Sequence, residues 1–209
     1  MWWAYPLVAL GAYMVGSIPT GVLVGKATRG IDVRNYGSGK TGFTNALRTL
    51  GWPPSLAVLL ADALKGYIPA IAVWLATDSH NLQMVAALMA VTGHIWPLFA
   101  GFRGGRGVAT AYGAFLAMSL PLTMILVVVA ALIVLTFRYM SLMSVLTVPL
   151  GALGLLGLAI AGAGPYSHAI YGSLAATLIV IQHRGNIQRL LSGTEPKLGK
   201  GGRRRPTTS

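Results

Sequence analysis

Residues 108–137 read VATAYGAFLAMSLPLTMILVVVAALIVLTF, a stretch without a charged side chain. The chain stays almost continuously apolar from there to Gln182 and is broken only at residues 119–121, 138–141 and 162–167. Because about 17 to 25 apolar residues suffice to cross the core of a bilayer, these breaks predict turns between membrane-spanning helices. The whole stretch therefore predicts four such helices, the first of them short.

Three further apolar runs precede this stretch, at residues 3–24, 53–76 and 82–100. The first is interrupted by Gly16, Ser17 and Pro19, which membrane helices tolerate. Together the runs predict an all-α integral membrane protein, a seven-transmembrane-helix bundle, with five spans as the minimum. Residues 1–197 are expected to form a single transmembrane domain, followed by a basic, disordered tail at residues 198–209.

Composition supports the membrane interpretation. Of the 209 residues, 55% are hydrophobic and only 10% are charged, which is too little polar surface to cover a soluble domain. The net charge of +12 does not indicate nucleic acid binding, because proteins that bind DNA or RNA do not combine such a charge with so apolar a sequence. The absence of cysteine excludes disulfides and thiol catalysis.

The distribution of basic residues predicts how the bundle is oriented. If the spans alternate in direction, all 16 lysines and arginines except Lys65 fall in loops on one side or in the tail. The positive-inside rule then places these loops and the C-terminus in the cytoplasm and the N-terminus outside. This arrangement requires an odd number of spans, which favours seven or five over six.

The loop after the first span carries the string GSGKTGFTN at residues 37–45. Glycines let backbone N–H groups converge on an anion, and serine, threonine, lysine and arginine add donors and charge. A nucleotide-binding P-loop is excluded, because that motif needs a glycine where Arg34 stands. The string predicts a phosphate-binding loop, and a flexible linker with topological charges is the alternative. The candidate substrate-binding residues are Gly37, Gly39, Lys40, Thr44, Asn45 and Arg48, with Ser38 as a candidate catalytic residue.

The loop after the third span reads Arg103-Gly104-Gly105-Arg106. Two arginines on a glycine hinge suit a phosphoryl group, so Gly104, Gly105 and Arg106 are candidate substrate-binding residues. The alternative is a tight turn whose cations only follow the positive-inside rule. His94, which lies inside the third span, is interpreted as a structural histidine.

The last span ends at His183, and Asn186 follows three residues later, so both share one face of a continuing helix. A neutral imidazole beside an amide can orient or deprotonate an attacking hydroxyl, which makes both residues candidate catalytic groups. The alternative is a helix end whose side chains cap its carbonyls.

Asp62 and Lys65 lie three residues apart near the middle of the second span. A lone charge at that depth is costly, so the two are expected to form a structural ion pair. In the alternative, functional interpretation, Lys65 lies beneath the anion-binding loops and binds substrate. No metal site is predicted, because the four histidines lack ligand spacing and no acidic cluster accompanies them.

These motifs resemble those of the bacterial acyl-phosphate:glycerol-3-phosphate acyltransferase family over about residues 5 to 197. The matching residues are Gly16-Ser17-Ile18-Pro19, Gly21, Asp32-Val33-Arg34, Gly37-Ser38-Gly39, Thr44-Asn45, Arg48, Asp62, Lys65-Gly66, Gly93-His94, Pro97, Phe102, Gly104-Gly105, Gly107-Val108-Ala109-Thr110, His183-Arg184, Asn186-Ile187, Arg189-Leu190, Gly193 and Glu195. The strings are long, ordered and specific.

The resemblance implies seven membrane helices in the bacterial plasma (inner) membrane and one reaction. The sn-1 hydroxyl of glycerol 3-phosphate attacks the carbonyl of an acyl phosphate, lysophosphatidic acid forms and inorganic phosphate leaves, with no cofactor and no direct use of acyl-CoA. By position, Ser38, Arg48, His183 and Asn186 fall on active-site residues of the family, and Arg106 falls where a lysine is usual. The expected partners are the two substrates and the lipid bilayer, with no nucleic acid and with a monomeric chain.

Three residues depart from the family pattern: Lys40 replaces asparagine, Phe43 replaces a small alanine, and Arg106 replaces lysine. Arginine keeps the charge but changes the donor geometry, and Phe43 is expected to crowd a loop that wraps an anion. A diverged paralogue with an altered acceptor or lost activity is therefore one alternative. The proton acceptor also stays open between His183 and a substrate phosphate oxygen.

A transporter or flippase of a phosphorylated metabolite is the alternative from another class of protein. It too would have charges inside the membrane and cationic mouths. Against it, the basic groups lie on one side only, whereas alternating access usually needs a midplane site within repeated halves. An acyltransferase that depends on acyl-CoA would typically carry a His-x4-Asp pair, which is missing from this sequence.

Overall fold

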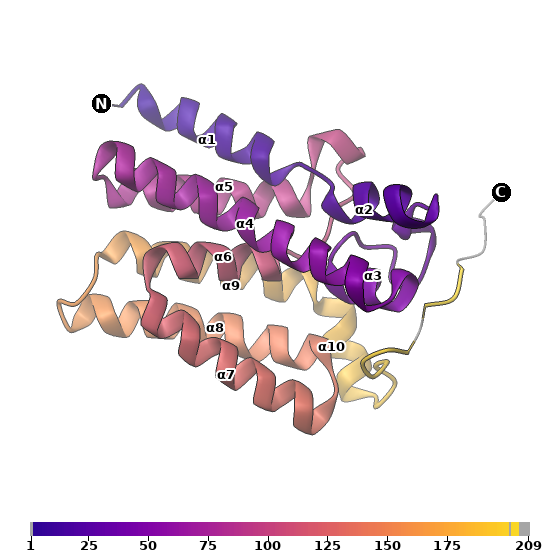
Figure 1. Cartoon of the computed structure of the whole chain (residues 1–209). Coiled ribbons are helices and arrows are strands. Elements are labelled where there is room, and N and C mark those ends of the chain that lie inside the picture. The colour runs from indigo at the N-terminus through magenta and orange to yellow at the C-terminus, as the bar shows by residue number, and fades with distance from the viewer. Residues whose placement is uncertain (1, 201, 205–209) are drawn as a thin grey trace.

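A computed structural model describes residues 2–200 and 202–204 as an all-helical bundle (Figure 1). The helices are α1 (Ala4–Gly16), α2 (Thr20–Arg29), α3 (Phe43–Leu50), α4 (Trp52–Thr77), α5 (His80–Ile95), α6 (Val108–Met118), α7 (Leu120–Phe137), α8 (Met140–Ile160), α9 (Tyr166–Gln182) and α10 (Arg184–Leu191), with the 3₁₀ turns η1 (Val33–Asn35) and η2 (Leu98–Ala100). The all-α prediction is confirmed.

The first apolar run forms two helices, not one. The chain leaves the helical path between α1 and α2 at Ser17, Ile18 and Pro19, because proline has no amide proton and its ring obstructs the preceding turn. The carbonyl oxygen of Ile18, which this break exposes, accepts a hydrogen bond of 3.0 Å from Nζ of Lys65 on α4. A polar side chain from a neighbouring helix thus satisfies the broken backbone inside the apolar region.

The other predicted turns lie where the sequence breaks indicated. Ser119 separates α6 from α7, and its hydroxyl oxygen accepts a hydrogen bond from the N–H of Leu122. Arg138 ends α7 with a φ of 63°, and Gly162 lies in the turn after α8 with a φ of 70°. As predicted, α6 is short, with 11 residues.

Within the described residues, five helical segments are long and apolar enough to cross a membrane. They are Ala4–Arg29, Trp52–Thr77, His80–Ala100, Leu120–Phe137 and Met140–Ile160. The helices α6 and α9, with 11 and 17 residues, are shorter. Many large apolar side chains point outward, such as Leu135 and Leu153, which are 78% and 64% exposed. Lipid is the environment that such a surface fits.

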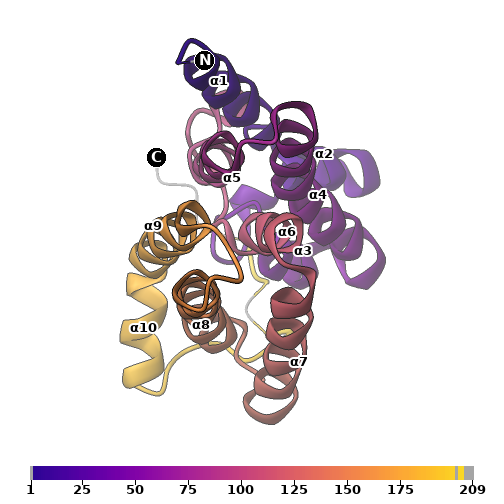
Figure 2. The same cartoon turned by 90° about the vertical axis from the view of Figure 1, so that its left-hand side faces the viewer.

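Close backbone contact joins α4 to α6 at the centre of the bundle, whose edges are formed by α1 and α7 (Figure 2). A Cβ atom on Gly66 would lie 1.9 Å from the carbonyl oxygen of Thr110, and one on Gly113 would lie 1.9 Å from that of Ala63. Only glycine fits at both positions, which is how membrane helices commonly achieve close packing. Beside this contact, Phe115 and Tyr171 pack edge to face between α6 and α9, with ring centroids 5.7 Å apart.

The cationic loops gather at one end of the bundle, near α2, α3 and α10, and the N-terminus lies at the other (Figure 1). Part of the chain after residue 197 also lies at this end. The N–H of Leu198 donates to the carbonyl oxygen of Arg138, and the N–H of Gly37 donates to that of Arg203. The rest of the predicted disordered tail, residues 201 and 205–209, lies outside the described residues.

Candidate active site

Asn45 holds the first loop in shape. Its Oδ1 accepts a hydrogen bond of 2.9 Å from the N–H of Ser38, and its Nδ2 donates to the carbonyl oxygens of Val33 and Lys40 at 2.8 and 2.9 Å. The loop folds back on α3 because one buried amide satisfies three of its backbone groups. Asn45 therefore orders the loop through contacts that use both ends of its amide.

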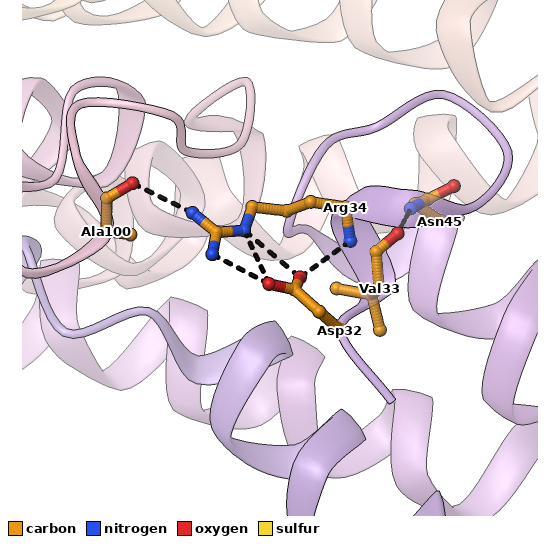
Figure 3. Close-up of polar contacts among 5 residues, drawn as sticks. All are labelled: Asp32, Val33, Arg34, Asn45 and Ala100. Atoms are coloured by element: carbon orange, nitrogen blue, oxygen red, sulfur yellow. Dashed lines mark hydrogen bonds and ion pairs between the residues drawn. The ribbon is translucent and has the colours of Figure 1, made fainter. Parts of the chain in front are cut away.

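Arg34, held by an ion pair within the same loop, fixes that loop to the turn after α5 (Figure 3). The guanidinium of Arg34 binds the Asp32 carboxylate at 2.7 Å through Nη2, and its Nη1 donates to the carbonyl oxygen of Ala100 at 2.8 Å. The hydrogen bond from Arg34 holds the pKa of Asp32 below its usual value. Both loops that carry candidate phosphate ligands are thereby joined by Arg34, a residue that sequence reasoning quoted in the family motif but gave no role in the site.

The second loop lies directly on His94. The N–H of Gly105 donates to the carbonyl oxygen of His94 at 3.1 Å. A Cβ atom on Gly104 would lie 2.1 Å from that oxygen, and one on Gly105 would lie 2.0 Å from Nε2 of the His94 ring. Both glycines are thus explained by close approach of the backbone to α5.

His183 ends α9 with its ring buried, 2% exposed. Its Nδ1 lies 2.8 Å from the carbonyl oxygen of Ile179, which can only accept, so Nδ1 carries the proton and Nε2 keeps its lone pair. Burial, reinforced by the nearby charges of Arg106 and Lys40, lowers the pKa of His183 to about 4. The imidazole is therefore neutral at physiological pH.

Glu195 organises the segment after α10. Its Oε1 accepts hydrogen bonds from Ser141 at 2.7 Å and from Nδ2 of Asn186 at 2.6 Å, and its Oε2 accepts from Nε of Arg189 at 2.8 Å. Burial alone would raise the pKa of Glu195, but these donors outweigh burial and lower it. The position of Asn186 is thus set by a carboxylate that sequence reasoning quoted in the motif but gave no role.

A cavity of about 260 Å³ opens between the loops and the helices. Six predicted site residues line it: Ser38, Lys40, Thr44, Asn45, Arg106 and His183. Burial, with the charges of Arg106 and Arg184, lowers the pKa of Lys40, and burial lowers that of Arg106 to about 10, so Arg106 stays charged at neutral pH. Such cations crowded around one cavity favour an anionic ligand.

The same cavity continues into an apolar limb between α4, α6, α7 and α8. Apolar side chains that line this limb include Leu59, Val108, Val127, Ala130 and Met143. Val127 is 45% exposed on the outer surface of α7, so the limb reaches the lipid-facing side of the bundle. A single cavity thus joins a cationic head to a lipid-facing slot.

The other predicted site residues do not line the cavity. They are Gly37, Gly39, Arg48, Lys65, Gly104, Gly105 and Asn186. Arg48 donates from Nη2 to the carbonyl oxygen of Pro196 at 3.3 Å. Nζ of Lys65 lies 2.7 Å from Oδ1 of Asp62, as the structural interpretation of this pair predicts. The same ammonium donates to the carbonyl oxygen of Ile18 in the break after α1.

Sequence reasoning missed two residues of the cavity wall, Asp62 and His94. Asp62 was interpreted only as a partner of Lys65, and His94 only as a structural histidine. The helix contact that brings them together joins residues 32 positions apart, and no local pattern signals it. Phe43, expected to crowd the loop, also lines the cavity, and its ring packs against Trp52 with centroids 6.2 Å apart.

The fold and this cavity define a multi-pass membrane protein in which an anionic group and an apolar chain can meet at one end of the bundle. The chain belongs to the glycerol-3-phosphate acyltransferase family, whose sequence pattern matches residues 6–193. Both the predicted family and the predicted enzyme class, an acyltransferase, are confirmed.

Curated relatives and solved structures agree with this membership. The chain is 41% identical over 197 residues to a glycerol-3-phosphate acyltransferase of Parasynechococcus marenigrum (strain WH8102), covering 93% of this chain and 89% of the relative. It is 44% identical over 199 residues to glycerol-3-phosphate acyltransferase 2 of Moorella thermoacetica, covering 95% and 98%. It also resembles the crystal structure of PlsY, an integral membrane glycerol 3-phosphate acyltransferase, in its glycerol 3-phosphate form. That match has a TM-score of 0.85 at 36% identity and covers 94% of this chain and 96% of PlsY.

Proposed function

We propose that this protein transfers an acyl group from an acyl phosphate to the sn-1 hydroxyl of glycerol 3-phosphate, giving lysophosphatidic acid and inorganic phosphate. The observation that carries the proposal is the single cavity with a cationic head and an apolar limb. An acyl phosphate has both parts, a phosphate and a long apolar chain, joined at the carbonyl that reacts. The crystal structures of PlsY in a glycerol 3-phosphate form and a lysophosphatidic acid form support the assignment of acceptor and product.

The cationic head would bind the phosphates. Arg106 and Lys40 line the cavity, and charge-assisted hydrogen bonds to phosphate oxygens are the strong kind. Neutralising the leaving phosphate eases its departure, and holding both substrates together lowers the entropic part of the barrier. The N–H of Ser38 donates to Asn45, which fixes the residue in place. The hydroxyl of Ser38 would donate to the developing oxyanion.

His183 would orient the attacking hydroxyl through Nε2, whose lone pair is left free by the bond from Nδ1 to Ile179. A pKa of about 4 makes this imidazole a weak base at neutral pH. A phosphate oxygen, with a second ionisation near pH 6, matches the working pH better. We therefore assign proton acceptance to a substrate phosphate and positioning to His183.

Seven membrane passes follow if α1 and α2 together make the first, and α4 to α9 make the others. This count leaves the N-terminus outside and the cationic loops in the cytoplasm of a bacterial cell, on the inner face of the plasma membrane. The apolar limb then admits the acyl chain from the bilayer while the phosphates are reached from the cytoplasm. A monomer is sufficient, since every group invoked above comes from one chain.

The reaction is tested with purified protein in lipid nanodiscs, supplied with glycerol 3-phosphate and an acyl phosphate. Lysophosphatidic acid and inorganic phosphate should form in equal amounts, and acyl-CoA should not replace the acyl phosphate. Arg106→Ala should lower kcat/KM about 10- to 100-fold, the worth of a charge-assisted contact. The exposed Arg103→Ala of the same loop is the matched control and should leave the rate unchanged. Equal activity in all three preparations would reveal a contaminating enzyme and reject the assignment.

The topology is tested by single cysteines in this cysteine-free chain. Lys200→Cys and Ala163→Cys are both exposed, at opposite ends of the bundle. An impermeant thiol reagent added to intact cells should label the cysteine at position 163 and should label that at 200 only after the membrane is permeabilised. Labelling of position 200 in intact cells would overturn the orientation.

A further inference from the structure

We propose that His94 is a positioning residue that holds the Gly104–Gly105 turn and thereby places Arg106 in the cavity. The inference rests on the proposed function, because it assigns a supporting structure to the phosphate-binding arginine of that site. It gives a task to a buried imidazole in the cavity wall that the reaction itself does not use.

The Nδ1 edge of the His94 ring faces the buried carboxylate of Asp62. Nδ1 of His94 lies 3.4 Å from Oδ1 of Asp62, and the two side chains, from α5 and α4, are 3% and 1% exposed. Oδ1 of Asp62 is itself held by Nζ of Lys65 at 2.7 Å and by the hydroxyl of Thr20. A carboxylate with two other donors cannot follow the ring, so the ring has a rigid neighbour on its Nδ1 edge.

The opposite edge of the ring meets the second loop. A Cβ atom on Gly105 would lie 2.0 Å from Nε2, 2.8 Å from Cε1 and 3.0 Å from Cδ2, so the backbone rests on that edge. The N–H of Gly105 also donates to the carbonyl oxygen of His94. The ring is thus wedged between the buried carboxylate and the glycine turn.

Arg106 depends on this turn for its position. Its Nε is buried without a hydrogen-bond partner in the described part of the chain, so no protein acceptor fixes that end of the guanidinium. The next residue, Gly107, is the N-cap of α6 with a φ of 86°, which fixes the chain on the other side of Arg106. The backbone at residues 105 and 107 therefore determines where the guanidinium meets a phosphate.

The test is a set of kinetic variants in the nanodisc assay. His94→Ala removes the support and should raise the KM for glycerol 3-phosphate about tenfold, with a smaller change in kcat, because phosphate binding is weakened. Gly105→Ala forces a Cβ atom against the ring and should raise that KM more than His94→Ala does. In the double variant His94→Ala/Gly105→Ala the clash is absent, so its KM should be lower than that of Gly105→Ala alone.

Gly104→Ala is the matched control, because its Cβ atom would meet the carbonyl oxygen of His94 and Cδ of Pro97, not the ring. Adding His94→Ala to it should give no recovery. A His94→Ala enzyme with parental KM, or additive effects in the Gly105 double variant, would overturn the inference. Thermal unfolding of each variant shows whether a loss of activity is due to a loss of folding. Additive effects on KM in variants that are folded count against the proposal. Failure of the parental enzyme to form product would reject the proposed function instead.

Discussion

Asp62→Ala is expected to be the most destabilising single change in this protein. It leaves the ammonium of Lys65, 6% exposed, with only the carbonyl oxygen of Ile18 as a partner in the interior of the bundle. Removing one member of a buried ion pair costs about 3–5 kcal/mol, which for a chain of this size lowers Tm by on the order of 10 °C. Thermal unfolding of the purified protein in detergent measures the effect.

The double variant Asp62→Ala/Lys65→Met separates charge from packing. It removes both charges, and apolar replacements of a buried pair are often neutral, so it should be more stable than Asp62→Ala. Stability should return more fully than activity, because Asp62 also supports the His94 ring in the cavity wall. A double variant no more stable than the single one would show that the unpaired ammonium is not the cause.

His183→Ala is expected to lower kcat about 10- to 100-fold, the worth of one hydrogen bond to the reacting hydroxyl. The pH profile identifies the proton acceptor. Burial and the neighbouring cations keep the pKa of His183 at about 4, so the imidazole stays unprotonated, and the residue competent, as pH falls from 8 to about 5. A fall in rate near pH 6 then reports protonation of a substrate phosphate and should persist in the variant.

His183→Gln is the companion variant, because the amide oxygen of glutamine can accept a hydrogen bond but cannot act as a base. It should be more active than His183→Ala if the residue positions the hydroxyl. Loss of about 10³-fold or more in both variants, together with disappearance of the acidic limb, would assign proton transfer to the imidazole.

Much of the fold could be predicted, because hydrophobicity and turn residues are local signals. The second apolar run, 53–76, became α4 within one residue at each end, and the breaks near Ser119 and Arg138 became turns. The first run was less predictable. Pro19 was interpreted as an interruption that one membrane helix tolerates, and that the chain breaks there and presents Ile18 to Lys65 required knowledge of α4.

The candidate site likewise has a part that the sequence predicts and a part that it does not. Glycines beside cations announced two anion-binding loops, and Ser38, Lys40, Arg106 and His183 do meet at one cavity. The three bonds of Asn45 to the first loop, and the contact of Gly105 with the His94 ring, could not be read from spacing. They depend on how backbones approach one another across the bundle.

By itself, the sequence determined that this chain is a membrane helical protein of one family with its cations on one side, because apolar length, charge and motif residues are properties of the chain. Only the tertiary structure decided which of those residues face a common space. It made His183 neutral through burial and two neighbouring cations, gave Glu195 the task of holding Asn186, and set Asp62 against His94. These are relations between distant segments, and burial and electrostatic fields exist only once those segments are packed.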